Sequence, residues 1–295
     1  MLKNPYGQVV FITGASSGMG RATAKLLLSH GFKVYGTSRK ERPDLDETNG
    51  EGFIKMMKMD VLDIESIRET VRRVAGREGG IDILVNNAGM NYAGSIEDTS
   101  YEEARKIIDT DFLGAAMVVK YVLPYMRRQN RGLIINVSSV GGYQALAYQS
   151  YYSAAKFALE AFSEALHVEV RNFGINVCIV EPGDTKTGAT DARLYAKETL
   201  INEAYKDEFK SSLEIIETWE RNGKSPYLIA SLIAKIIKKK NPPVRVPQYG
   251  YKLFYLMTRI LPRKFELWLF SYVYTPGIKN MNVRRQKRKE MRAGK

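Results

Sequence analysis

Residues that bind metals or form disulfides are scarce in this chain of 295 residues. It has one cysteine, Cys178, and two histidines, His30 and His167. A lone cysteine cannot form an internal disulfide, which is typical of proteins from reducing compartments. Three such ligands scattered along the sequence do not make a zinc or haem site, so no metal is expected.

Long apolar runs are also missing. The longest uncharged stretch of the apolar C-terminal region, residues 267–278, is shorter than the roughly 20 residues that cross a bilayer. The first residues lead directly into an apolar strand pattern, so no signal peptide is expected. These features favour a cytoplasmic protein, with a peripheral position at a membrane surface as the alternative.

Strand-like and helix-like segments alternate along the chain, and 44% of the residues are hydrophobic, enough for a sizeable core. The pattern predicts one doubly wound α/β domain of the Rossmann type, with about seven parallel strands and helices on both faces. Continuous apolar runs predict strands at residues 8–13, 33–37, 53–59, 81–85, 133–137, 175–180 and 244–246. Helical periodicity is found at residues 21–30, 64–77, 101–128, 150–172 and 227–237.

Positive charge is concentrated late in the chain. The formal net charge is +13, from 45 basic and 32 acidic residues. The basic tail contains Arg284, Arg285, Lys287, Arg288, Lys289, Arg292 and Lys295. We expect a catalytic domain at residues 1–250 and an amphipathic helical extension with this tail at 251–295. No nucleic-acid partner is expected; a basic protein that binds nucleic acid or anionic lipid is the competing hypothesis.

A glycine-rich turn follows the first predicted strand, with the spacing Gly14-x-x-x-Gly18-x-Gly20. Such a turn directs backbone N–H groups and a helix N-terminus at a pyrophosphate. The second strand ends without the acid that binds the ribose diol of NAD; Arg39 and Lys40 follow it instead. These cations suit a 2′-phosphate, so NADP(H) is expected and NAD(H) is less favoured. Lesser donors are Ser16, Ser17 and Ser38.

Tyr152 and Lys156 are four residues apart, so a helix places them on one face. A lysine ammonium favours the phenolate and lowers the pKa of a tyrosine, which makes the pair a candidate general acid/base. Ser139 ends the fifth predicted strand, and its hydroxyl could hold a carbonyl oxygen beside the phenol. By spacing alone, a solvated helix face remains the alternative.

Five ordered motifs together resemble the short-chain dehydrogenase/reductase family. They are Thr13–Gly20, Asp60-Val61, Asn86–Gly89, the Ser139/Tyr152/Lys156 set, and Pro182-Gly183 with Thr187. The resemblance implies hydride transfer between a nicotinamide and a carbonyl carbon, with Tyr152 as proton donor. It implies cofactor contacts from Gly14, Ser16, Ser17, Gly18, Met19, Gly20, Ser38, Arg39, Asp60, Val61, Asn87, Ala88, Gly89, Tyr152, Lys156, Pro182, Gly183, Thr185 and Thr187.

One residue departs from the family pattern. Asp111 stands where the family usually has a catalytic asparagine that supports a proton relay to the lysine. An aspartate keeps the acceptor but loses the amide donor. Its charge near Lys156 is expected to raise the pKa of the lysine and weaken the effect of the lysine on Tyr152. We therefore expect a relay with altered pH dependence.

The substrate region is expected to be apolar. By resemblance, residues 188–225 form a variable lid. Ser139 and Tyr152 are expected at the substrate, beside an apolar, aromatic wall of Tyr143, Gln144, Leu146 and Tyr148. A bulky alcohol or ketone, such as a steroid, retinoid or lipid-like molecule, fits the similarity to 17β-hydroxysteroid dehydrogenase-like and retinol dehydrogenase-like branches. The alternative is that these aromatic residues pack an oligomer interface.

Partners and competing functions follow from the same features. The family commonly forms homodimers or homotetramers through the two long helices before and after the fifth strand. Residues 251–274 either cap the pocket or a dimer partner, or lie on a membrane surface as a basic aromatic helix pair. A nucleotide-binding sensor that has lost turnover is the alternative function, and it depends on Asp111.

Overall fold

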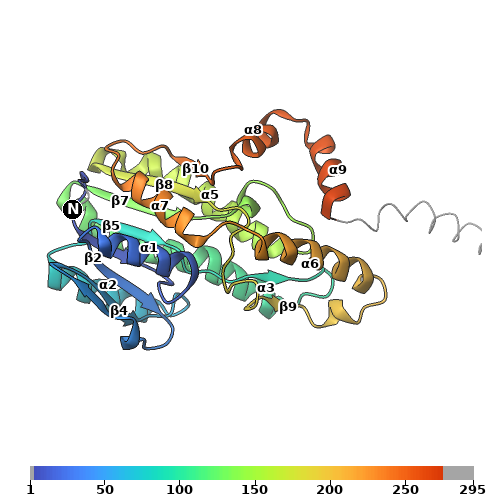
Figure 1. Cartoon of the computed structure of the whole chain (residues 1–295), viewed down its shortest axis with the longest axis horizontal. Helices are drawn as coiled ribbons and strands as arrows, with labels where there is room; N and C mark the ends of the chain where they lie inside the picture. Colours follow the sequence, from blue (N-terminus) through green and yellow to red (C-terminus); the bar gives the residue numbers. More distant parts are fainter. Residues whose placement is uncertain (1–2, 275–295) are drawn as a thin grey trace, which may run out of the picture.

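The computed structural model describes residues 3–274, so the basic tail expected near the C-terminus lies outside the described residues. Its centre is a sheet in the order β10-β8-β7-β5-β1-β2-β4-β3 (Figure 1). The predicted parallel sheet is confirmed, and an eighth strand, β3, pairs antiparallel with β4. The strands are β1 (Val9–Ile12), β2 (Lys33–Ser38), β3 (Glu47–Asn49), β4 (Gly52–Lys58), β5 (Ile83–Asn86), β7 (Gly132–Val137), β8 (Ile175–Glu181) and β10 (Arg245–Pro247). The sequence Glu-Thr-Asn of β3 is short and polar, so it carries no apolar pattern that would predict a strand.

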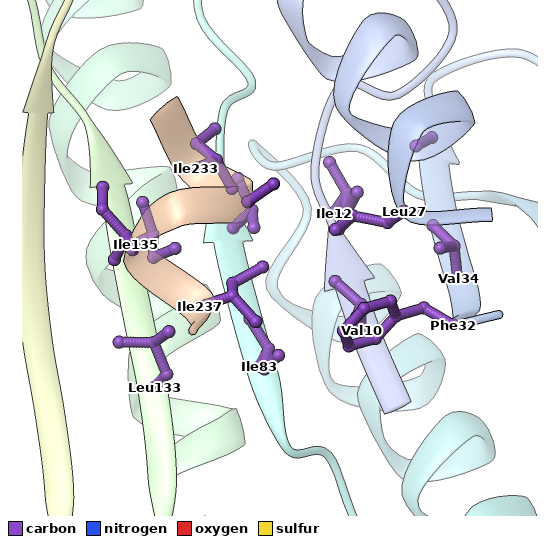
Figure 2. Close-up of a cluster of buried hydrophobic side chains, with 14 of the residues drawn as sticks. Val10, Ile12, Leu27, Phe32, Val34, Ile83, Leu133, Ile135, Ile233 and Ile237 are labelled. Carbon is purple, nitrogen blue, oxygen red and sulfur yellow. The ribbon is translucent and has the colours of Figure 1, made fainter. Parts of the chain in front are cut away.

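Helices cover both faces of the sheet, as a parallel sheet requires. On one face α1 (Gly18–Ser29) and α7 (Pro226–Ile237) pack side by side over the central strands. Figure 2 shows Leu27 of α1 and Ile233 of α7 above Ile12, Ile83 and Ile135. The other face is covered by α2 (Ile64–Glu78), α4 (Gly114–Gln129) and α5 (Ser150–Val170). Each fully buried aliphatic side chain of these layers stabilises the fold by about 1.5–3 kcal/mol.

The helical pattern at residues 101–128 is divided in the structure. α3 (Tyr101–Ile108) begins with a capping box between Ser100 and Glu103. A π-helical segment, η2 (Asp109–Leu113), then leads into α4. The wider turn directs the Asp111 side chain into the protein, where it is 1% exposed. Short π-helical segments of this kind occur frequently at functional sites, and the helical periodicity of the sequence alone does not reveal them.

Two further groups of elements lie beside the sheet. The first consists of β6 (Tyr92–Ala93) paired with β9 (Leu194–Tyr195), then η5 (Glu198–Leu200) and α6 (Lys206–Arg221). All of these except β6 lie within residues 188–225, the region expected as a lid. The second consists of α8 (Lys252–Ile260) and α9 (Arg263–Tyr274), which project from the body in Figure 1. Short 3-10 turns are η1 (Pro43–Leu45), η3 (Val140–Gly142) and η4 (Arg171–Phe173). Among the described helices, none is both long and apolar enough to cross a membrane.

Candidate active site

The predicted catalytic residues converge on one pocket. Ser139 follows β7, Tyr152 and Lys156 lie on the first two turns of α5, and Pro182-Gly183 follows β8. The pocket has a volume of about 130 Å³. Its lining includes Met19, Ser139, Leu146, Gln149, Tyr152, Gly183, Asp184, Thr185, Thr187, Ile216, Trp219, Glu220 and Tyr251. It therefore opens at the C-terminal ends of the strands, where ligands of this kind of sheet bind.

Tyr152 lies against both expected partners. The Lys156 ammonium lies 5.7 Å from the centre of the Tyr152 ring, and the Ser139 side chain lies on the pocket wall beside Tyr152. Burial raises the pKa of Tyr152, whereas Lys156 and Ser139 act to lower it and Asp111 adds to the rise. Lys156 acts in the expected direction, but burial outweighs it, so the pKa of the phenol is raised overall. The protonated phenol is consequently favoured at neutral pH, as a proton donor requires.

Asp111 contacts the catalytic lysine directly. Its Oδ1 lies 3.1 Å from Lys156 Nζ, and both side chains are buried. The Met90 amide donates to Asp111 Oδ2 at 3.2 Å, and Lys156 Nζ donates to the Val137 carbonyl at 3.4 Å. Burial by itself disfavours the ammonium, but Asp111 and then Tyr152 more than offset this and raise the pKa of Lys156. Burial raises the pKa of Asp111 as well, against the opposing effect of Lys156 and the Met90 amide, so the expected acid lies beside the lysine as one member of a buried Asp–Lys pair.

The glycine turn fits a pyrophosphate. Gly14 adopts φ +67° and Gly18 φ +54°, which favour glycine, and a Cβ on Gly20 would come within 2.4 Å of the Gly14 carbonyl oxygen. The Asn87 side chain donates to the Thr13 and Gly14 carbonyls at 3.0 and 3.2 Å, which fixes the turn against the end of β5. Ser17, the N-cap of α1, makes no side-chain capping bond. The first N–H groups of the helix, which point toward the turn, are therefore left free of a side-chain acceptor from Ser17.

The end of β2 presents unpaired cations. Arg39 and Lys40 are exposed, and no acidic side chain of residues 3–274 pairs with Arg39. Ser38 donates its hydroxyl to the Lys40 carbonyl. On the neighbouring strand end, Asp60 accepts the Leu62 amide at 3.0 Å, which shapes the loop that contains Val61. A phosphate on the adenosine ribose would meet positive charge here, without a competing carboxylate.

Tyr143 and Gln144 do not line the pocket. Tyr143 is 5% exposed, and its ring packs at 5.2 Å from that of Tyr255. Gln144 is fully buried and accepts a hydrogen bond from Arg263 at 3.3 Å. These two side chains support α8 and α9, because the 3-10 turn η3 directs them away from Tyr152. Leu146 lines the pocket as expected, together with Ile216 and Trp219 of α6. The Tyr148 ring packs 5.3 Å from that of Phe209 and does not line the pocket.

A buried charge cluster behind the site is not predicted from the sequence. Arg245 of β10 forms ion pairs with Glu160 and Glu164 of α5 and, at 2.7 Å, with Glu181 of β8. Glu160 also accepts the Ser138 hydroxyl at 2.7 Å. These residues adjoin the catalytic ones along the chain: Ser138 precedes Ser139, Glu160 lies one helical turn after Lys156, and Glu181 precedes Pro182. That adjacency is the only signal in the sequence.

Comparisons with known proteins agree on the kind of protein. Residues 8–198 match the family model described as short chain dehydrogenase. A 3-ketodihydrosphingosine reductase of Bacteroides thetaiotaomicron is 46% identical over 238 residues, which cover 81% of this chain and 86% of that protein. A short-chain dehydrogenase from Streptomyces avermitilis is 33% identical, with a TM-score of 0.78 over 91% of this chain and 98% of that chain. The structure of ElxO with NADP bound is 26% identical, with a TM-score of 0.69 over 84% and 99% of the two chains. A nicotinamide cofactor is common to this group.

Proposed function

Because the chain belongs to the short-chain dehydrogenase/reductase family, and so is an oxidoreductase of CH–OH groups, we propose that it interconverts a secondary alcohol and a ketone or aldehyde with NADP(H), on a bulky hydrophobic substrate. The observation that carries the proposal is that Ser139 and Tyr152 line one pocket with an apolar wall, with the Lys156 ammonium 5.7 Å from the Tyr152 ring. Within this class we favour a long-chain lipid ketone.

The chemistry follows from the side chains. NADPH supplies a hydride to the carbonyl carbon of the substrate. The phenol of Tyr152 donates its proton to the oxygen on which negative charge develops, while the Ser139 hydroxyl donates a hydrogen bond to the same oxygen. Lys156 stabilises the phenolate that remains, and Asp111 holds the lysine in its charged form. In alcohol oxidation the same groups act in reverse, with the phenolate as base.

The proposed preference for NADP(H) depends on the end of β2. Arg39 can donate two parallel hydrogen bonds to a phosphate, and Lys40 adds a second positive charge. Neither the end of β2 nor the turn after β1 offers a carboxylate to the ribose diol of NAD. Replacing Arg39 with alanine should lower kcat/KM for NADPH about tenfold or more, since a charge-assisted hydrogen bond is worth about 1.5–3 kcal/mol. The kcat/KM for NADH should change little.

The pocket supports a lipid ketone that carries an amine. Leu146, Ile216 and Trp219 offer apolar contacts to a chain, and Asp184 faces the same space. Burial raises the pKa of Asp184, and the hydrogen bond that the Tyr251 hydroxyl donates to its carboxylate offsets this only in part. An ammonium beside the carbonyl would stabilise that carboxylate. A 2-amino ketone such as 3-ketodihydrosphingosine has this arrangement, and a relative at 46% identity is named for that activity.

The test is oxidation of NADPH and NADH with a panel of carbonyl compounds: 3-ketodihydrosphingosine, a long-chain ketone without the amine, a steroid ketone and the aldehyde retinal. We expect turnover with NADPH, fastest on the long-chain ketones, and a loss of about 10²–10⁴ in kcat for Tyr152→Phe. Asp184→Asn should raise KM for the amino ketone about tenfold and leave the amine-free ketone unchanged.

The controls separate the parts of this proposal. Equal effects of Asp184→Asn on both long-chain ketones would remove the role of the amine but not the enzyme. Tight NADPH binding without turnover on any compound of the panel, with turnover restored by Asp111→Asn, would favour the nucleotide-binding sensor instead.

A further inference from the structure

The outer face of α8 is apolar. Leu253, Leu256, Met257 and Ile260 recur at the spacing of one helix face, and all four are exposed. Leu253 is 70% exposed and Ile260 is 79% exposed. An amphipathic helix of a globular protein normally turns such a stripe toward the core. Here the stripe is turned outward.

The inner face of α8 already has its own contacts. The Phe254 and Tyr255 rings lie 6.0 and 5.2 Å from the ring of Tyr143. Tyr251, just before the helix, forms a hydrogen bond with Asp184. The helix is therefore attached to the body through its aromatic residues, and the outward stripe contributes nothing to that attachment.

The next helix, α9, also carries exposed apolar side chains. Phe265 and Trp268 are one turn apart and exposed, with their ring centres 5.7 Å apart. Trp268 is 60% exposed. Figure 1 shows α8 and α9 together, projecting from the body of the protein. We call Leu253, Leu256, Met257, Ile260, Phe265 and Trp268 the outer apolar stripe.

The charged residues around the stripe indicate what kind of surface it would bind. Lys252, Arg259, Arg263 and Lys264 lie on the same two helices and are exposed. The one acid of the pair, Glu266, is 1% exposed and forms an ion pair with Arg263 at 2.9 Å. The sequence after α9 adds Arg284, Arg285, Lys287, Arg288 and Lys289. Apolar side chains among exposed cations match the interface of a bilayer that contains anionic lipids.

We propose that the outer apolar stripe is a membrane-docking surface, and that its occupant is the interface of an anionic lipid bilayer. Large exposed apolar patches of this kind mark interaction sites. Tyr251 connects the surface to the active site, since it lines the pocket and immediately precedes α8. Membrane docking is consistent with the proposed function, because a long-chain lipid ketone would reside in the same membrane. Docking itself requires no catalysis.

The experiment is co-sedimentation of the full chain with vesicles of phosphatidylcholine containing about 30% phosphatidylserine, at physiological salt. We expect the protein to sediment with these vesicles, and Leu253→Gln with Ile260→Gln to weaken binding about tenfold or more. These substitutions keep the net charge and suit a helix, so a loss of binding reports on apolar contact. Ile96→Gln, at an apolar residue exposed elsewhere, is the matched control and should bind as the unchanged protein does.

Tyr152→Phe separates docking from catalysis, since it should bind vesicles normally. A second readout uses Trp268: in a Trp219→Phe background it is the remaining tryptophan, and its emission should shift to the blue on vesicles. The proposal is overturned if the emission of Trp268 does not shift and the protein stays in the supernatant. It is also overturned if Leu253→Gln with Ile260→Gln binds as tightly as the unchanged protein, which would assign binding to the basic tail. Dissociation of a dimer by those substitutions, without vesicle binding, would assign the stripe to a second copy.

Discussion

Asp111 is the single residue that most alters the electrostatics of the site. Its carboxylate adds negative charge beside Lys156 and Tyr152, where an asparagine would add none. Removing the charge should lower the pKa of both groups, since a negative neighbour favours the protonated form of each. Asp111 therefore keeps Tyr152 protonated to higher pH, which favours the reducing direction.

We predict that Asp111→Asn moves the pH dependence of catalysis to lower pH. Alcohol oxidation needs the phenolate, so its rising limb should appear at lower pH in this variant. Ketone reduction needs the phenol, so its rate should begin to fall at lower pH as well. The measurement is the pH–rate profile in both directions.

Asp109→Asn is the matched control for this prediction. Asp109 lies on the same π-helical segment, half-buried and paired with Arg105 at 3.3 Å, without contact to Lys156. Its profile should not move. Identical pH–rate profiles for Asp111→Asn and the unchanged protein would contradict the electrostatic role of Asp111.

Among the elements, β10 joins the two that position the catalytic residues. It provides Arg245, whose guanidinium lies between Glu160 on α5 and Glu181 on β8. Burial, and then repulsion from Glu160, raises the pKa of Glu181 to about 7. Three carboxylates, those of Glu160, Glu164 and Glu181, face the one guanidinium of Arg245, so acidic groups outnumber basic ones in this cluster.

The cluster predicts how stability depends on pH. An unfolded glutamate loses its proton near pH 4.3, whereas the folded Glu181 keeps it to about pH 7. Within that window the folded state binds more protons, so the free energy of unfolding falls as the pH rises. Glu181→Gln should remove that contribution, which is on the order of 3 kcal/mol at most.

Urea unfolding at about pH 5 and about pH 8 would measure this contribution of Glu181 to the free energy of unfolding. The difference between the two free energies of unfolding should shrink in Glu181→Gln. Glu164→Gln is the control, because Glu164 pairs with the same arginine but is 52% exposed. If both variants keep the full difference, another group governs the pH dependence.

At the scale of the whole molecule, α5 presents a second apolar face. Ala154, Phe157, Ala161, Ala165 and Val168 follow one side of the helix and are exposed. A groove of about 450 Å³ lies next to this face, between α4 and α5. Small apolar residues on a long helix allow close packing of a second helix. This face suits the homo-oligomer expected from the family.

We predict a dimer through α4 and α5, with a mass in solution twice the 33.4 kDa of the chain. Ala165→Glu places a charge at the centre of this face and should shift the protein toward a monomer in light scattering. Ala204→Glu, at an exposed alanine outside this face, should leave the mass unchanged. A monomeric parent protein would contradict the prediction directly.

The sequence by itself determined the features that depend on local spacing. Apolar runs predict the parallel strands because both faces of such a sheet are buried. The glycine turn after β1 requires φ values that few residues other than glycine adopt, and the four-residue separation of Tyr152 and Lys156 sets them on one helical face. These patterns carry their geometry within a few residues.

Only the tertiary structure decided which distant side chains meet. The contact of Asp111 with Lys156 depends on a π-helical turn, and Arg245 reaches Glu160 and Glu181 only through the pairing of β10 with β8. Tyr143 packs under α8 and not in the pocket, and that packing turns the apolar stripe of α8 outward. Periodicity defines the faces of a helix, but the packing of the chain decides which face meets the protein and which meets its surroundings.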